Sequence, residues 1–166
     1  MKKILTAIII SAIVFVSSCG GVSAKALLEY GRGSFTATLS TSIDGIDVPV
    51  SVIKDGGTLS FIVDEKYTFV YNDGNWSVSY SGLTVPISAD SIKRSLPQKL
   101  CTALTLTHDA GWKASYETVN EISRIKCECA QADVALYFDA DSRLPIKISS
   151  GGVEFDVLKF DPADTE

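Results

Sequence analysis

The amino-acid sequence predicts a mainly β protein: a curved antiparallel sheet, or half-barrel, of about ten strands with a short N-terminal helix and one broken helical lid. Three observations predict this fold. Hydrophobic residues recur at every second position over most of the chain after residue 34, which is typical of strands with one buried face. Glycine-containing pairs that favour tight hairpin turns separate the segments. Only residues 89–104 place hydrophobic residues at helical spacing. The turn sequences are Asp44-Gly45, Asp55-Gly56-Gly57, Asp73-Gly74 and Ser81-Gly82.

The first 18 residues have the pattern of an export signal. Two lysines precede an apolar run of 13 residues, from Ile4 to Val16. A helix needs about 20 apolar residues to cross a bilayer, so this run fits the hydrophobic region of a signal peptide better than a membrane span. We therefore assign residues 1–18 to a signal peptide.

The residues that follow indicate how the protein is anchored. The sequence Val-Ser-Ser at 16–18 before Cys19 resembles the lipobox of bacterial lipoproteins. That resemblance implies that the Cys19 thiol receives a diacylglycerol and becomes the new N-terminus, held by acyl chains such as palmitate. Residues 19–24 would then be a lipidated linker on the extracytoplasmic side of the cell membrane or outer membrane. In the alternative, residues 22–24 form an ordinary cleavage site, and a soluble protein beginning at Lys25 is released.

The domain begins with a short predicted helix over residues 25–30, followed by a meander of six strands. In the first strand Phe35, Ala37 and Leu39 share one face, and the hydroxyl-bearing residues between them share the other. Pro49 lacks a backbone donor, which predicts an edge strand or a bulge in the second segment. The six segments with this alternation are 35–43, 46–52, 59–63, 67–71, 76–80 and 83–87.

A helical lid and a second run of strands complete the predicted domain. Ser88 or Asp90 provides a helix cap, and Pro97 divides the helical stretch into two short pieces. We assign residues 25–160 to a single domain and residues 161–166 to a polar tail. The helical face consists of Ile92, Leu96, Leu100 and Leu104, and the later strands are 112–116, 122–129, 134–138, 144–148 and 153–157.

The apolar face of such a sheet is larger than its helical cover. Ten strands at about 4.8 Å give a sheet about 50 Å across, whereas one helix covers about two strands. The sheet must therefore curl, either around a packed core or around an apolar hollow with almost no inward charge that suits a lipid or acyl chain. The residues expected to line this interior are Phe61, Phe69, Trp76, Val78, Leu83, Leu136 and Phe138.

The closing segment resembles that of a known superfamily. It reads Leu136-Tyr137-Phe138-Asp139, then Leu144-Pro145-Ile146-Lys147-Ile148, then Phe155-Asp156-Val157 and Phe160. Together with the order of elements, this is similar to the LolA, LolB and LppX superfamily of extracytoplasmic lipoprotein and lipid carriers. The resemblance implies an unclosed barrel with a helical lid that binds and transfers acyl chains, with a lipid or an acylated protein as partner. The alternative is a lipoprotein interaction module with a filled core, acting in envelope assembly or sporulation.

The charge balance excludes some classes of partner. The chain has 15 Lys and Arg against 20 Asp and Glu, and loss of Lys2 and Lys3 with the signal takes the formal net charge from −5 to −7. No basic patch compensates, which argues against nucleic acid and anionic lipid surfaces as partners.

Few residues have the pattern of a reactive site. A disulfide from Cys101 to Cys127 or Cys129 is one alternative for an exported protein, and free thiols are the other. A zinc site formed by these three cysteines and His108 ranks third, because the usual paired Cys-x-x-Cys spacing is missing. His108 lacks a nucleophile and an orienting carboxylate at suitable spacing. We therefore expect no enzymatic activity, metal or cofactor.

Overall fold

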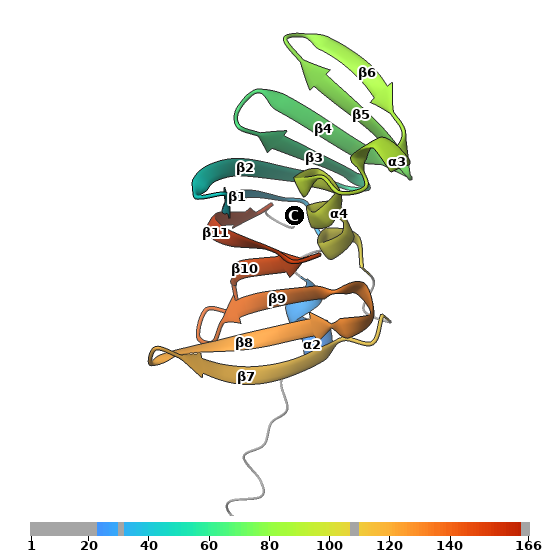
Figure 1. The fold of residues 1–166 in the computed structure, drawn as a ribbon. Helices are drawn as coiled ribbons and strands as arrows, with labels where there is room; N and C mark the ends of the chain where they lie inside the picture. The colour runs from blue at the N-terminus through green and yellow to red at the C-terminus, as the bar shows by residue number, and fades with distance from the viewer. Residues whose placement is uncertain (1–22, 30–31, 107–109, 164–166) are drawn as a thin grey trace, which may run out of the picture.

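The computed structural model describes residues 23–29, 32–106 and 110–163. The predicted signal peptide, Cys19 and His108 lie outside these residues. The described part contains one eleven-stranded antiparallel sheet, in the order β6-β5-β4-β3-β2-β1-β11-β10-β9-β8-β7 (Figure 1). Its two edges, β6 and β7, do not pair with each other. The half-barrel predicted from the sequence is therefore confirmed.

The first meander occupies one half of the sheet. Its hairpins turn where the sequence predicted them: Asp44 and Gly45 have φ values of 52° and 79°, and Asp73 and Gly74 have 46° and 84°. Positive φ at both central residues gives the hairpin turn whose twist matches that of the strands. The strands are β1 (Phe35–Ile43), β2 (Ile46–Asp55), β3 (Thr58–Val63), β4 (Tyr67–Asn72), β5 (Asn75–Tyr80) and β6 (Leu83–Ile87).

The second meander occupies the other half, and the two halves join through β1 and the last strand. β11 pairs antiparallel with β1, with Phe35 opposite Pro162 and Thr36 opposite Asp161. The sheet thus includes Asp161 and Pro162, the first two residues of the predicted polar tail. The strands are β7 (Lys113–Val119), β8 (Ile122–Cys129), β9 (Val134–Asp139), β10 (Pro145–Ser150) and β11 (Val153–Pro162), with the 3₁₀ turn η2 (Ala130–Ala132) between β8 and β9.

Pro49 does not mark an edge strand or a bulge. It lies in β2, an interior strand between β1 and β3, and is opposite Ser40 in regular register. The β2–β3 ladder begins only at Val50 opposite Val63, and the carbonyl of Pro49 accepts a hydrogen bond from the Asp64 amide, 3.1 Å away, in the turn after β3. The missing donor therefore faces a position where β3 has already ended, so no ladder bond is lost.

Three short α-helices are described: α2 (Ala24–Leu28), α3 (Ala89–Ile92) and α4 (Leu96–Thr105). Ser88 caps α3 through the Ser91 amide, as predicted. The lid is divided before Pro97, which lies in the first turn of α4, where a missing donor costs nothing. Ser95 caps α4 by accepting a hydrogen bond from the Gln98 amide.

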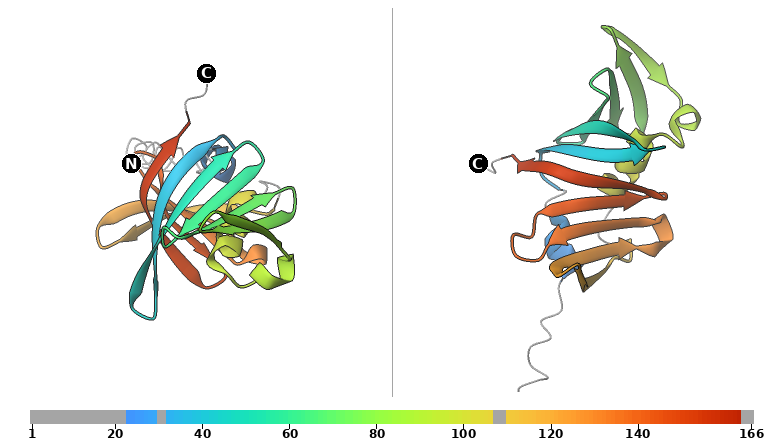
Figure 2. Two further views of the ribbon diagram at one scale, coloured as in Figure 1. Left: turned by 90° about the horizontal axis from the view of Figure 1, so that it is seen from above. Right: turned by 60° about the vertical axis from the view of Figure 1, so that its left-hand side comes forward.

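The chain between β6 and β7 crosses from one edge of the sheet to the other and carries α3 and α4. The strands rotate relative to one another, so the sheet is strongly twisted and curved (Figure 2). The core lies between α4, α2 and the inward side chains of the middle strands; Leu39, Phe61, Leu100 and Phe155 are each 0–1% exposed. Of the described helices, none is long and apolar enough to cross a membrane.

Candidate functional site

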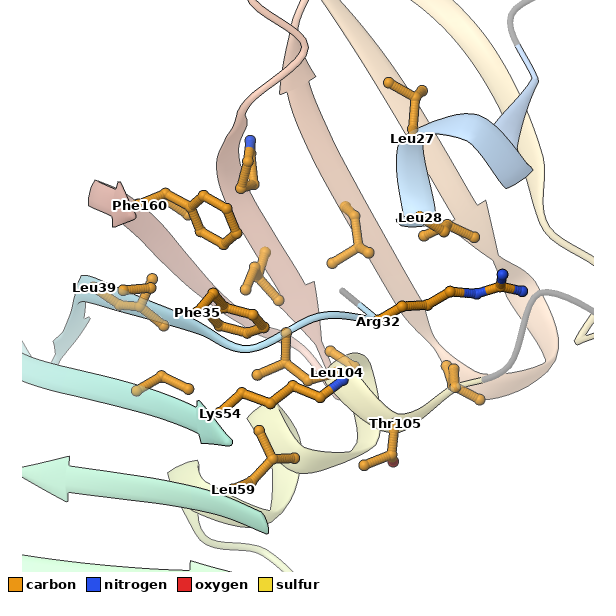
Figure 3. Close-up of a pocket in the computed structure, with 18 of the residues that line it drawn as sticks. Leu27, Leu28, Arg32, Phe35, Leu39, Lys54, Leu59, Leu104, Thr105 and Phe160 are labelled. Carbon is orange, nitrogen blue, oxygen red and sulfur yellow. The ribbon is translucent and has the colours of Figure 1, made fainter. Parts of the chain in front are cut away.

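An apolar cavity of about 430 Å³ lies between the sheet and the helices. Its walls come from α2, β1, β2, β3, α4, β9, β10 and β11, so both meanders contribute (Figure 3). The lining residues are Leu27, Leu28, Arg32, Phe35, Ala37, Leu39, Val52, Lys54, Gly56, Gly57, Leu59, Ala103, Leu104, Thr105, Leu106, Leu136, Phe138, Pro145, Ile148, Val157 and Phe160.

Two small side chains help to leave this space open. Ala37 lies on the inward face of β1, opposite Val52 on β2 and Phe160 on β11. Ala103 lies on the buried face of α4. Both positions line the cavity, and each side chain ends at Cβ, so neither fills the space between sheet and helix. The packing between sheet and lid is therefore incomplete here.

Two hydrogen bonds hold α4 against the sheet. The Ser150 hydroxyl at the end of β10 donates to the Lys99 carbonyl over 2.8 Å, and the Lys99 ammonium donates to the Gly151 carbonyl over 2.7 Å. Ser150 is only 2% exposed, so its bond is sheltered from water and fixes one turn of the helix to the β10–β11 hairpin. The helix α4, which covers the cavity, is thus attached to the second meander.

The mouth of the cavity is marked by its exposed lining residues, which are Arg32, Gly56, Gly57 and Thr105. Lys54, at the end of β2, is half-buried beside them. Its side chain extends from β2 toward α4, and Arg32 extends along the same opening (Figure 3). The sequence predicts almost no inward charge, and these two cations correct that expectation.

The position of Lys54 follows from the alternation of β2. Val50 and Val52 are buried and face inward, and Lys54 continues the same series two residues later. Its neighbours across the ladders are Phe35 and Leu59, both almost fully buried. Burial lowers the pKa of Lys54, because the partly desolvated site disfavours the ammonium.

The second cation is more exposed. The Arg32 guanidinium lies 2.8 Å from the carboxylate of Glu29, three residues earlier, and both side chains are about half exposed. An exposed ion pair of this kind contributes little to stability. Lys54 is therefore the more strongly sheltered of the two cations at the mouth.

The seven residues predicted to line the interior separate into two groups. Leu136 and Phe138 on β9 line the cavity. Phe61 and Trp76 are core residues with ring centroids 5.9 Å apart, and Leu83 is 76% exposed. The periodicity identified the inward face of β3–β6, but of the residues described on this face only Leu59, near the start of β3, reaches the cavity lining. The other two predicted residues, Phe69 and Val78, are half-buried and do not contribute to the lining.

Cys101, Cys127 and Cys129 are free and buried in the structure, so the disulfide considered from the sequence is not formed in it. The Cys129 thiol instead contacts the Ala110 carbonyl at 3.0 Å. Desolvation raises the pKa of Cys101 to about 12 and that of Cys127 to about 11. Thiols with such pKa values are not activated as nucleophiles or metal ligands at neutral pH. Within the described ranges, no group of three or more His, Cys, Asp or Glu side chains is placed to hold a metal ion.

Comparison with known proteins supports the fold. No protein-family model and no curated protein matches the chain. Among solved structures it is similar to an uncharacterized conserved protein from Thermus thermophilus, with a TM-score of 0.51 and 11% identity over 87% of this chain and 90% of that one. Similarity at this identity establishes the fold alone.

Two further structures are more distant. A chain of the Pseudomonas aeruginosa MucA/MucB complex has a TM-score of 0.38 and 14% identity, covering 86% of this chain and 56% of that one. This chain thus spans little more than half of that protein. LprF from Mycobacterium bovis has a TM-score of 0.39 and 10% identity, covering 87% and 97%. The architecture, an unclosed antiparallel sheet with helices across its inner face, agrees with the fold that the resemblance of the closing segment implied.

Proposed function

We propose that this protein is a lipid-anchored extracytoplasmic binding protein whose cavity takes up an apolar ligand, namely a lipid or the acyl chain of another lipoprotein. The observation that carries the proposal is the apolar space between α4 and the sheet. The proposed activity is binding or carriage, without a chemical step.

The size and lining of the cavity suit such a ligand. Small-molecule sites in proteins measure about 300–1,000 Å³ and are lined mainly by apolar side chains with a few polar groups. This cavity has about 430 Å³ and mostly aliphatic and aromatic walls. Each methylene transferred from water contributes about 0.8 kcal/mol, so ten buried methylenes give about 8 kcal/mol before the entropic costs of binding. A single acyl chain is therefore a sufficient ligand.

The anchor rests on the lipobox-like sequence before Cys19. Two acyl chains on that residue hold a protein to a membrane far more firmly than one chain does. Mass spectrometry of the mature N-terminus tests this part: we expect a diacylglyceryl-modified Cys19. A mature chain that begins at Lys25 would refute the anchor and leave the cavity proposal intact.

Uptake of a fluorescent fatty acid tests the cavity. Purified protein stripped of co-purified lipid should bind cis-parinaric acid stoichiometrically. Ala37→Leu places three more carbons in the cavity and should weaken binding at least tenfold, by ~1.4 kcal/mol or more, while thermal unfolding shows that the variant still folds. Thr36→Leu is the matched control, because the Thr36 side chain is next to Ala37 in sequence but is exposed on the opposite face of β1. Absence of uptake by the unmodified protein would exclude the proposed function.

A second candidate is an interaction module in the cell envelope, favoured by the apolar surface of β4–β6. Tyr67 and Tyr80 stack with centroids 5.0 Å apart, and they are 42% and 51% exposed beside Leu83 and Val85, at 76% and 51%. Exposed apolar patches of this kind mark protein interaction sites. This candidate predicts that Leu83→Lys disrupts complexes formed in the envelope but leaves fatty acid uptake unchanged.

A further inference from the structure

We propose that the ligand of the cavity is an anionic amphiphile, with its acyl chain inside and its carboxylate or phosphate group at the mouth, bound by Lys54. The inference rests on the proposed function and deepens it by naming the head group. It is carried by the juxtaposition of an apolar cavity with an inward-facing lysine at its opening.

Lys54 occupies a position that the strand otherwise gives to aliphatic residues. It is on the inward face of β2 after Val50 and Val52, between Phe35 and Leu59 on the neighbouring strands. A lysine at such a place loses part of its hydration, which lowers its pKa. The Lys54 side chain extends from β2 toward α4 at the mouth of the cavity (Figure 3), where a bound head group would lie.

The charge around the opening is opposite to that of the whole protein. The chain has 20 acidic against 15 basic residues, yet of the described residues that line the cavity two are cationic and none is acidic. Asp55 follows Lys54, but alternation places it on the other face of β2, where it accepts a hydrogen bond from Ser34 over 3.4 Å. The cavity lining therefore carries two cations, one of them paired with Glu29, in an acidic protein.

The two cations differ in their expected contribution. The Arg32 side chain is about half exposed, so water weakens its attraction for an anion. Lys54 is more sheltered, and a charge-assisted hydrogen bond gains strength where water is partly excluded. We therefore assign the anion to Lys54, with Arg32 at the outer edge. Fatty acids and lysophospholipids share this chemistry, an anion joined to one acyl chain.

A pair of probes that differ only in charge tests the inference. We expect the protein to bind cis-parinaric acid about tenfold more tightly than its uncharged methyl ester. Lys54→Met keeps an apolar stem and removes the charge, so it should lower affinity for the acid about tenfold and leave affinity for the ester unchanged. Lys54→Arg should retain the preference for the acid. Lys113→Met on the edge strand β7 changes the net charge equally and should behave like the unmodified protein.

The outcomes separate this inference from the proposed function. Equal binding of acid and ester by the unmodified protein, or an equal loss of both probes in Lys54→Met, would overturn the anionic head group and leave apolar binding intact. Binding of neither probe would overturn both proposals. Displacement of the bound acid by oleic acid indicates a carboxylate head, and displacement by lysophosphatidic acid indicates a phosphate head. Equally effective displacement by uncharged monoolein would contradict the assignment.

Discussion

The middle of the sheet and the wing formed by β4–β6 have the same alternation of hydrophobic residues but different burial. In the middle strands, Leu39 and Val50 are 0–1% exposed. In the wing, Tyr80 is 51% and Leu83 is 76% exposed on the corresponding series. Figure 1 shows α4 across the middle strands and the wing extending beyond it. The alternation of hydrophobic residues therefore identifies the inward face of the sheet, whereas the position of the helices determines which part of that face is buried.

Within the wing, the burial of side chains changes from one end of the strands to the other. Trp76 and Ile87 are paired in the β5–β6 ladder near the start of α3; Trp76 is 5% exposed, and Ile87 packs against the core. Tyr80 and Leu83 are paired at the other end of the same ladder and are exposed. Burial thus declines along the wing away from α3, which follows β6 directly.

The largest expected contrast is in core packing. Phe61 on β3 is fully buried and stacks on Trp76. Phe61→Ala should lower the free energy of unfolding by about 3–5 kcal/mol, because it removes buried area and leaves a void. Leu83→Ala in the wing should change it by less than about 0.5 kcal/mol. Urea unfolding of both variants measures the difference, and similar losses would show that the wing is as well covered as the middle.

The buried cysteines provide a second contrast. With pKa values raised to about 12 for Cys101 and about 11 for Cys127, both thiols are protonated at pH 8. Their alkylation by iodoacetamide should be at least about a hundredfold slower than that of a cysteine introduced by Thr84→Cys in the wing. Peptide mass spectrometry follows each site. Rapid native-state modification of Cys101 would mean that α4 opens readily from the sheet.

The attachment of the lid gives a smaller effect. Ser150→Ala removes the buried hydrogen bond to the Lys99 carbonyl, so it should cost about 1–3 kcal/mol of stability. Ser79→Ala removes an exposed bond to Thr84 of 2.7 Å in the wing, and we expect it to cost less than about 0.5 kcal/mol. Equal costs in urea unfolding would contradict a lid held by a bond sheltered from water.

The smallest expected effect concerns the tyrosine stack of the wing. Tyr67 and Tyr80 are both partly solvated, so a double-mutant cycle with leucine at each position should give a coupling of about 0.5 kcal/mol. Thermal or urea unfolding of the four proteins provides the cycle. A coupling several times larger would indicate a rigid, well-packed wing.

Much of the fold follows from local patterns. Alternation and Asp-Gly turns identified the strands, and helical spacing identified the lid. Turns without glycine were harder to place: Asp64 and Glu65 have φ values of 51° and 55°, and Asn120 and Glu121 have 50° and 66°. Asp64 and Asn120 are residue types that tolerate positive φ, whereas Glu65 and Glu121 do not favour it, so at the two glutamates the pairing of the flanking strands fixes the backbone.

The cavity was less predictable because its walls depend on long-range packing. Leu136 and Phe138 were identified through the inward face of β9, but the roof contributed by Ala103 depends on where α4 lies against β9 and β10. Lys54 could have been found by extending the series Val50 and Val52 by one step. The hydrophobic pattern of β2 ends at Val52, so hydrophobicity alone does not include the lysine that follows on the same face.

Hydrogen exchange with and without cis-parinaric acid tests most directly whether the covered cavity is the binding site. We expect added protection in residues 35–39, 52–59 and 96–106, which carry much of the cavity lining, and no change in residues 67–87 of the wing. Protection confined to the wing, or no protection in any segment at saturating acid, would contradict ligand binding between α4 and the sheet.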